Sequence, residues 1–190
     1  MAIARVMGMD AQRGRWLLVL VGFLMNMCLG AIYAFSVFRK PLEGLWAISA
    51  AQSGLPFMVF LATFAFVMPI AGSWMVKWGP KKTSMLGGLL VGMGWMGASF
   101  SPSIEVLAIL YGIIGGAGVG ITYGCPIAVT ARWFPHKGGL PIGLTVMGFG
   151  ISALVMAPIM NALIGAVGPL QAFLYPVSYT HLTLPTKRIV

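Results

Sequence analysis

The sequence predicts an all-α polytopic membrane protein, and three observations lead to this fold class. Of the 190 residues, 59% are hydrophobic and only 8% are charged, and the mean hydropathy is +0.94. A soluble globular protein carries about 25% charged residues, so this chain has too little polar surface for a water-soluble body. The chain is also too hydrophobic for an intrinsically disordered protein. The third observation is a series of long uncharged segments, most of them close to the roughly 20 residues that a spanning helix needs.

The uncharged segments predict five transmembrane helices and the start of a sixth. We expect helices near residues 16–38, 53–76, 84–100, 105–130 and 140–165, with a truncated helix at 169–175. Residues 1–15 then form a cytoplasmic N-terminal segment, and residues 16–175 form the transmembrane domain. Transmembrane strands are the alternative, but these alternate apolar and polar residues in segments of about ten. The segment Phe57–Ile70 is apolar on every face, which favours a helix in lipid.

The positions of lysine and arginine predict the orientation of the chain. Cytoplasmic loops of membrane proteins carry an excess of both residues. One side has Arg5, Arg13, Arg15, Lys77, Lys81, Lys82, Arg132 and Lys137, whereas the opposite side has Arg39 and Lys40. We therefore expect a multi-pass protein of the cell (inner) membrane with a cytoplasmic N-terminus. The basic residues are scattered singly, so the net charge of +9 does not indicate nucleic-acid binding.

Residues 176–190 (PVSYTHLTLPTKRIV) differ in character from the rest of the chain. A hydrophobic helix begins at Leu170 and stops after Tyr175. The tail resembles the translation of adapter DNA from transposon-based sequencing libraries, which matches Val177–Thr186 residue for residue. We therefore expect a non-native tail and a native protein that continues beyond Tyr175. The alternative is a genuine polar C-terminal tail.

Small and polar residues within the predicted helices indicate how the helices pack. Gly112, Gly116, Gly120 and Gly124 follow one another at intervals of four, which places them on one helix face. Glycine on such a face allows another helix backbone to approach closely. Asn26 is a polar group within hydrocarbon, so we expect it to face the bundle interior and bond across it.

The sequence contains none of the residue patterns that enzyme chemistry needs. The run GGAGVG at 115–120 does not fit a dinucleotide-binding loop and lies within a predicted helix. His136 and His181 cannot build a metal site, and Cys28 and Cys125 lie in different predicted helices. The sequence shows no nucleophile–base pair and no carboxylate pair. We expect neither enzymatic activity nor a cofactor or metal.

The loop Gly72–Lys82 (GSWMVKWGPKK) resembles the signature loop of the major facilitator superfamily, between the second and third helices. The positions that match this motif, and that we assign to gating, are Gly72, Lys77, Gly79, Lys81 and Lys82. Val76 stands where the family has an aspartate, which in the family helps to latch the two halves of the transporter. The alternative is a plain positive cytoplasmic loop with a turn at Gly79.

Two further segments are similar to the oxalate/formate antiporter family within this superfamily. They are Leu29–Glu43 and Tyr111–Gly143, and their most specific part is RWFP at Arg132–Pro135. The resemblance covers residues 16–175. It implies a fold of twelve helices in two six-helix halves, of which this chain holds a partial N-terminal six-helix half.

The resemblance also implies a function, the secondary active transport of small organic anions by alternating access. In the family a mono- or dicarboxylate lies at the membrane midplane, where cations of the C-terminal half bind it. The candidate substrate-binding residues here are Tyr33, Tyr123 and Asn26. The alternatives are an interfacial position for each tyrosine and a helix–helix bond for Asn26. The predicted helices contain no acidic relay, which favours exchange over proton coupling.

The expected partners are therefore a small organic anion, the lipid bilayer and the missing C-terminal half. Two alternative functions stay open. A carrier of another solute on the same fold would differ in the charges of the missing helices. A short membrane protein that acts by helix–helix association would require the tail at 176–190 to be genuine.

Overall fold

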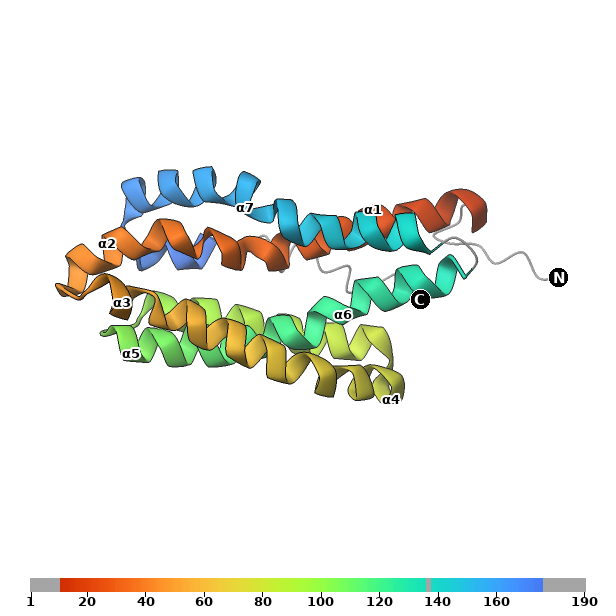
Figure 1. Cartoon of the computed structure of the whole chain (residues 1–190), viewed down its shortest axis with the longest axis horizontal. Helices are drawn as coiled ribbons and strands as arrows, with labels where there is room; N and C mark the ends of the chain where they lie inside the picture. The colour runs from red at the N-terminus through yellow and green to blue at the C-terminus, as the bar shows by residue number, and fades with distance from the viewer. Residues whose placement is uncertain (1–10, 136–137, 176–190) are drawn as a thin grey trace.

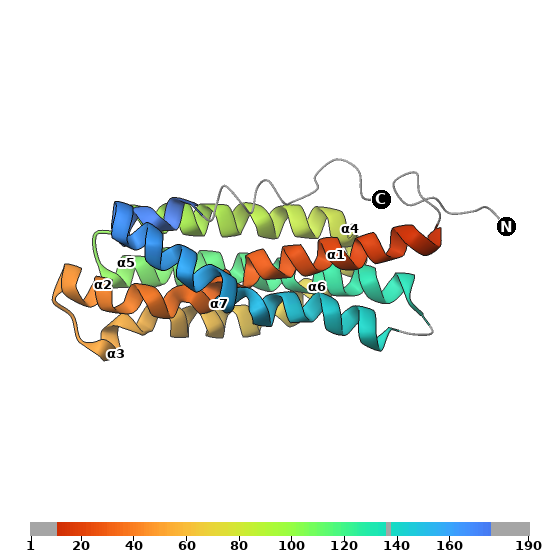
Figure 2. The same cartoon turned by 90° about the horizontal axis from the view of Figure 1, so that it is seen from above.

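The computed structural model describes residues 11–135 and 138–175, and every regular element in these ranges is a helix. The helices run along one common axis and form an elongated bundle (Figures 1 and 2). The expectations for residues 1–10 and for the tail at 176–190 fall outside the described ranges.

The first helical segment consists of α1 (Ala11–Leu29), a 3-10 helix η1 (Gly30–Phe35) and α2 (Ser36–Trp46), which follow one another without a break. It ends at Ala47, whose φ of 50° lies in the left-handed region. The helix thus continues beyond residue 38, where we expected its end, and carries Arg39, Lys40 and Glu43. Falling hydrophobicity marks where a helix leaves the hydrocarbon, but its backbone hydrogen bonds can continue into the polar region.

The chain continues with α3 (Ala50–Ser53) and α4 (Leu55–Ser99), and α4 contains a chain reversal (Figure 1). Gly79 has φ 78° and ψ 162°, a conformation that residues with a Cβ rarely adopt. This break divides α4 into a first half (55–78) and a second half (80–99), close to the expected 53–76 and 84–100. The Thr83 hydroxyl donates a 2.9 Å hydrogen bond to the Gly79 carbonyl oxygen and so holds the turn.

The next segment consists of α5 (Ile104–Leu107), a π-helical stretch η2 (Ala108–Gly115) and α6 (Gly116–Trp133). It is followed by α7 (Gly139–Val167) and a short 3-10 helix, η3 (Gln171–Phe173). These bounds extend the expected ranges 105–130 and 140–165 slightly, and η3 lies within 169–175. In the described part of the chain, four helices are long and apolar enough to cross a membrane, one of which is broken at Gly79. The chain is therefore an all-α, multi-pass membrane protein.

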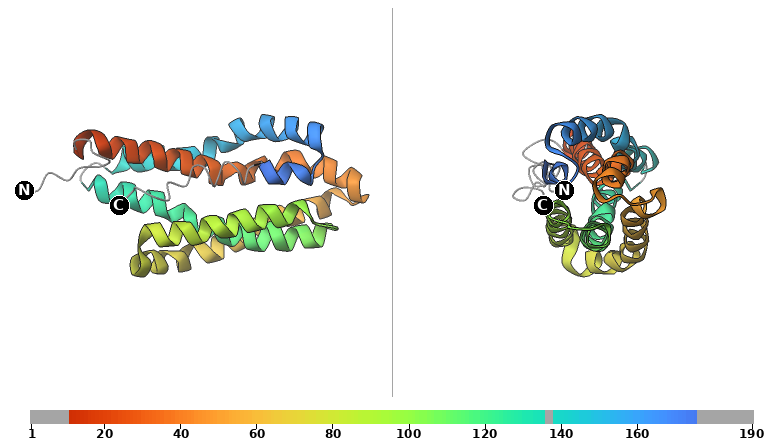
Figure 3. Two further views of the ribbon diagram at one scale, coloured as in Figure 1. Left: turned by 180° about the vertical axis from the view of Figure 1, so that it is seen from behind. Right: turned by 90° about the vertical axis from the view of Figure 1, so that its left-hand side faces the viewer.

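The helices form two groups, which Figure 3 shows from behind and from one end. In one group α7 packs along α1 and η1, and in the other η2 and α6 pack along α4. Helix α6 connects the groups, because it contacts α4 over its first part and α1 and α7 over its last part.

Glycines of α6 allow both halves of α4 to pack closely against it. A Cβ at Gly116 would lie 2.8 Å from the Phe60 carbonyl oxygen, and one at Gly118 would lie 2.5 Å from the Val91 amide nitrogen. Both distances are shorter than van der Waals contact, so no larger residue fits without a shift of the backbone. Further close approaches are those of Gly112, in η2, to Val59 and of Gly120, in α6, to Phe64.

Gly124 does not share this packing, contrary to the four-residue pattern. Among the described residues, no atom lies within 4 Å of the position that its Cβ would take. Beyond Gly120, α6 diverges from α4 and approaches α1 (Figure 1), where a Cβ at Gly22 would lie 3.3 Å from Pro126. A run of glycines at intervals of four therefore marks one helix face but not one partner along its whole length.

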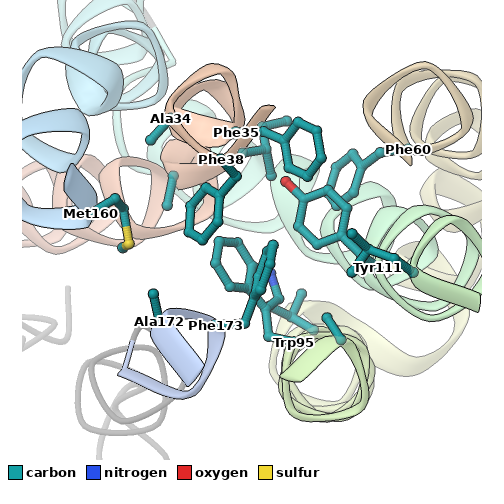
Figure 4. Close-up of a cluster of buried hydrophobic side chains, with 14 of the residues drawn as sticks. Ala34, Phe35, Phe38, Phe60, Trp95, Tyr111, Met160, Ala172 and Phe173 are labelled. Atoms are coloured by element: carbon teal, nitrogen blue, oxygen red, sulfur yellow. The ribbon is translucent and has the colours of Figure 1, made fainter. Parts of the chain in front are cut away.

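Buried aromatic rings fill the core at the end of the bundle that holds α2 (Figure 4). The rings of Phe38 and Phe173 stack with centroids 4.3 Å apart, and Tyr111 lies 5.1 Å from Phe35 and 5.4 Å from Trp95. Phe173 belongs to η3 and is fully buried. The start of the sixth helical segment is therefore part of the core.

We expect Gly116→Ala to destabilise the bundle and Gly124→Ala to leave it intact. The methyl group at Gly116 meets rigid backbone, and overpacking of this kind costs about 1–3 kcal/mol. The methyl group at Gly124 meets no described atom, and alanine favours a helix by about 1 kcal/mol over glycine. Thermal unfolding in detergent, followed by size-exclusion chromatography, measures the difference as a lower Tm for Gly116→Ala alone. Equal Tm values for the two variants would contradict the packing of α6 on α4.

We expect Gly79→Ala to disturb the turn within α4, because the conformation at this residue costs a residue with a Cβ about 1–3 kcal/mol. Gly72→Ala is the matched control, since its Cβ would have no described atom within 4 Å. Amide hydrogen exchange over residues 76–83 measures the effect. Faster exchange is expected in Gly79→Ala only, and identical exchange in both variants would show that the turn does not require glycine.

Candidate functional site

Aromatic side chains from four elements meet around Phe149 of α7. Its ring centroid lies 4.9 Å from that of Tyr123 in α6 and 5.3 Å from that of Tyr33 in η1. The ring of Phe64, in the first half of α4, lies 6.1 Å away, and Phe57 of the same helix lies 6.5 Å from Tyr33. We call these five residues the Phe149 cluster. It joins the two helix groups near the middle of α6 and α7.

The two tyrosines of the Phe149 cluster are more accessible than the phenylalanine at its centre. Phe149 is 6% exposed, whereas Tyr33 is 40% exposed and Tyr123 is half-buried. Each phenol therefore packs against Phe149 and keeps other atoms accessible. A phenol combines an apolar ring with a hydroxyl that can donate a hydrogen bond to a carboxylate. The structure thus brings together the two tyrosines that the sequence singled out.

Sequence analysis does not identify the three phenylalanines of the cluster. Phe149 stands between Gly148 and Gly150, and this single bulky ring among small residues is the one signal that indicates it. Phe57 and Phe64 lie in a segment with several other phenylalanines (FMVFLATFAF). Tertiary packing decides which of these rings faces the cluster. The composition of the segment alone therefore does not identify them.

Asn26 is not part of the Phe149 cluster, and its assignment as a substrate-binding residue stays a prediction. Its side chain is fully buried between α1 and α7, and Nδ2 donates a 2.9 Å hydrogen bond to the Thr145 carbonyl oxygen. The two helices are close here, because a Cβ at Gly22 would lie 3.0 Å from the Thr145 side chain. The structure confirms the other expectation for Asn26, a hydrogen bond across the interface between two helices.

The loop Gly72–Lys82 surrounds the turn of α4 and lies at the end of the bundle that holds the start of α1 (Figure 1). The side chains of Lys77, Lys81 and Lys82 are exposed, and Val76 is 80% exposed. Valine has no charge, so this position cannot form the ion pair that an aspartate would form. The loop therefore presents cations to its surroundings, and its role in gating stays a prediction.

The segment Arg132–Pro135 closes the same end of the bundle. Phe134 is 5% exposed, and the Arg15 guanidinium carbon lies 5.0 Å from its ring centroid, within the range of a cation–π contact. Trp16 meets the same ring edge-on, with centroids 5.3 Å apart. These contacts join the end of α6 to the start of α1. Phe134 of this motif therefore stabilises the packing of the two helices.

Comparison with known proteins relates the chain to membrane transporters. A sequence profile of the Major Facilitator Superfamily matches residues 15–180. The oxalate:formate antiporter of Oxalobacter formigenes is 34% identical over 162 residues, which cover 85% of this chain and 38% of the antiporter. Monocarboxylate transporter 13 of Rattus norvegicus is 29% identical over 150 residues, which cover 78% of this chain and 35% of that protein. Apicoplast pyruvate carrier 1 of Toxoplasma gondii is 29% identical across 85% of this chain and 38% of the carrier.

These matches extend over nearly all of the helices described above. The chain spans 35% to 38% of the length of these three curated relatives. The all-α architecture and the chain reversal at Gly79, inside the signature loop, agree with the profile match. The chain belongs to the Major Facilitator Superfamily.

Proposed function

We propose that this chain is part of a secondary transporter that moves small organic anions by alternating access. The observation that carries the proposal is the Phe149 cluster, in which Tyr33 and Tyr123 present accessible phenols from different helices. The relatives support it, because their names specify oxalate and formate, monocarboxylates, or pyruvate. All of these solutes carry a carboxylate.

The chemistry of the cluster suits a carboxylate that lies against its two tyrosines. In the proposal each hydroxyl donates a hydrogen bond to a carboxylate oxygen, and such charge-assisted bonds are stronger than neutral ones. The rings of the cluster would also give the bound carboxylate an apolar surrounding on one side, which strengthens such bonds. The cluster contains no cation, so the charge that balances the anion comes from a second half of the transporter.

We further propose that the transporter exchanges one anion for another. The Phe149 cluster contains no aspartate, glutamate or histidine, the side chains that form proton relays inside transporters, so binding of the anion at these residues is not coupled to such a relay. When the site is empty, the cations contributed by the second half have no partner. This imbalance opposes reorientation of the empty carrier, which couples export of one anion to import of another.

We place the protein in the cell (inner) membrane with its N-terminus in the cytoplasm. The end of the bundle with the turn of α4 and the start of α1 carries Arg15, Lys77, Lys81, Lys82 and Arg132 (Figure 1). The tendency of cytoplasmic segments to be positive supports this orientation. The signature loop then faces the cytoplasm, where we propose that it contributes to gating.

We expect Tyr33→Phe and Tyr123→Phe each to raise the KM for the transported carboxylate while the protein still folds. Each change removes one hydroxyl and keeps the ring that packs against Phe149. Hydrogen bonds to charged groups contribute about 1.5–3 kcal/mol, which corresponds to roughly a 10- to 100-fold change in affinity. Uptake of labelled oxalate, formate and pyruvate into proteoliposomes of the full-length protein provides the measurement.

Tyr111→Phe is the matched control for these variants. Tyr111 is fully buried in the aromatic core, and its hydroxyl has no hydrogen-bond partner in the described part of the chain. This variant also removes a tyrosine hydroxyl, but one that lies outside the Phe149 cluster. We therefore expect its KM to equal that of the wild type. If the wild type takes up none of the three carboxylates, the substrate class is wrong. If all three variants have the same KM as the wild type, the Phe149 cluster is not the binding site.

A further inference from the structure

Three buried polar side chains join α7 to α6 and to α1, the helix that continues into η1 with Tyr33. The Asn26 side chain bonds to the Thr145 carbonyl oxygen at 2.9 Å, which joins α1 to α7. The hydroxyl oxygens of Thr130 and Thr145 are 3.2 Å apart, which joins α6 to α7. All three side chains are fully buried. We call Asn26, Thr130 and Thr145 the polar layer.

The direction of the hydrogen bonds in the polar layer follows from the single proton of each hydroxyl. Thr145 Oγ1 donates to the Pro141 carbonyl oxygen at 2.9 Å, so its proton is used within α7. Thr130 is therefore the donor in its contact with Thr145. Thr145 accepts from both neighbouring helices, at its carbonyl oxygen from Asn26 and at its hydroxyl oxygen from Thr130.

Thr130 and Thr145 each share a helix face with one ring of the Phe149 cluster, and Asn26 lies about two turns before a third ring. Asn26 precedes Tyr33 by seven residues, Thr130 follows Tyr123 by seven, and Thr145 precedes Phe149 by four. Within α6 and α7 these separations correspond to about two turns, or roughly 10 Å, and to about one turn, or roughly 6 Å. From Asn26 to Tyr33 the chain passes from α1 into the 3-10 helix η1, whose larger rise gives roughly 12 Å. Helix α6 runs opposite to α1 and α7 (Figure 1), so the three rings all lie on the same side of the polar layer.

The glycines of this interface bring the helices together but do not fix how far one is shifted along the other. A Cβ at Gly30 would lie 2.7 Å from the Ser152 Cβ, and Gly148 faces the Phe23 backbone closely. Such surfaces are smooth, and smooth surfaces permit sliding. A buried hydrogen bond is directional, and a single buried asparagine can specify the register of packed helices.

We propose that the three members of the polar layer are positioning residues for the Phe149 cluster. They set the register of α1, α6 and α7, and this register holds the two phenols at the spacing that one carboxylate needs. The polar layer itself touches no substrate. The inference rests on the proposed function of the cluster.

Thr130→Val in the full-length transporter tests the proposal, because valine has nearly the same shape and carries a methyl group in place of the hydroxyl. We expect the KM for the transported carboxylate to rise by about three- to tenfold, since small misplacements of binding groups weaken binding strongly. We expect kcat to change by less than about twofold and the Tm to change little, because hydrogen bonds between membrane helices contribute only about 0.6 kcal/mol on average. Thr130→Ser keeps the hydroxyl, so we expect this variant to have the wild-type KM.

Thr122→Val is the matched control on the same helix. Thr122 is also buried, but its hydroxyl donates only to the Gly118 carbonyl oxygen of its own helix, at 2.9 Å. Its replacement breaks no bond between helices, so the KM stays at the wild-type value. An equal rise in KM for Thr122→Val and Thr130→Val would overturn the inference.

A second readout does not depend on transport. The fluorine NMR signals of 3-fluorotyrosine at Tyr33 and Tyr123 respond to their position over the Phe149 ring, and Tyr111 serves as an internal reference. We expect Thr130→Val to shift the first two signals and to leave the third in place. If the wild type transports no carboxylate, the proposed function fails, and the NMR shifts still test the polar layer. Unchanged shifts for Tyr33 and Tyr123 would overturn the inference.

Discussion

The whole bundle depends on close backbone contact at the glycine-lined faces of α6. In lipid an apolar side chain gains little by leaving one apolar environment for another, so helices associate through tight packing and hydrogen bonds between them. Gly116 faces the first half of α4, and Gly118 faces the second half. Because the last part of α6 packs on α1 and α7, this helix holds the two groups together. The Phe149 cluster lies where the groups meet, so its geometry follows from the same contacts.

The hydrophobic pattern predicts the number and order of the helices because the hydrocarbon imposes a minimum length on every spanning segment. It does not predict where a helix ends. Helix α2 continues to Trp46, and the charge of Arg39 on this helix is accommodated by hydrogen bonds from its guanidinium to Ser53 Oγ and the Ala50 carbonyl oxygen of α3. The break at Gly79 is different, since its positive φ leaves a signature in the sequence, a glycine before a proline.

The candidate site could be predicted only in part. Resemblance to a known family singles out Tyr33 and Tyr123, and the structure brings both against one ring. That ring, Phe149, lies on a third helix, and its contacts depend on the register of all three helices. The periodicity of a sequence shows which face of a helix a residue occupies but not which partner meets that face. Gly124 differs from expectation for this same reason.

The buried asparagine of the polar layer is not the residue that would stabilise the interface most. In the described part of the chain, Asn26 Oδ1 is buried without a hydrogen-bond partner, and an unsatisfied buried group costs about 1–3 kcal/mol. A leucine at this position would remove that cost and fill the same space between α1 and α7. It would also remove the directional bond to Thr145, and the glycine surfaces alone would then determine the register. An asparagine is therefore the better residue only if the position of Tyr33 relative to Phe149 matters more than the stability of the helix pair.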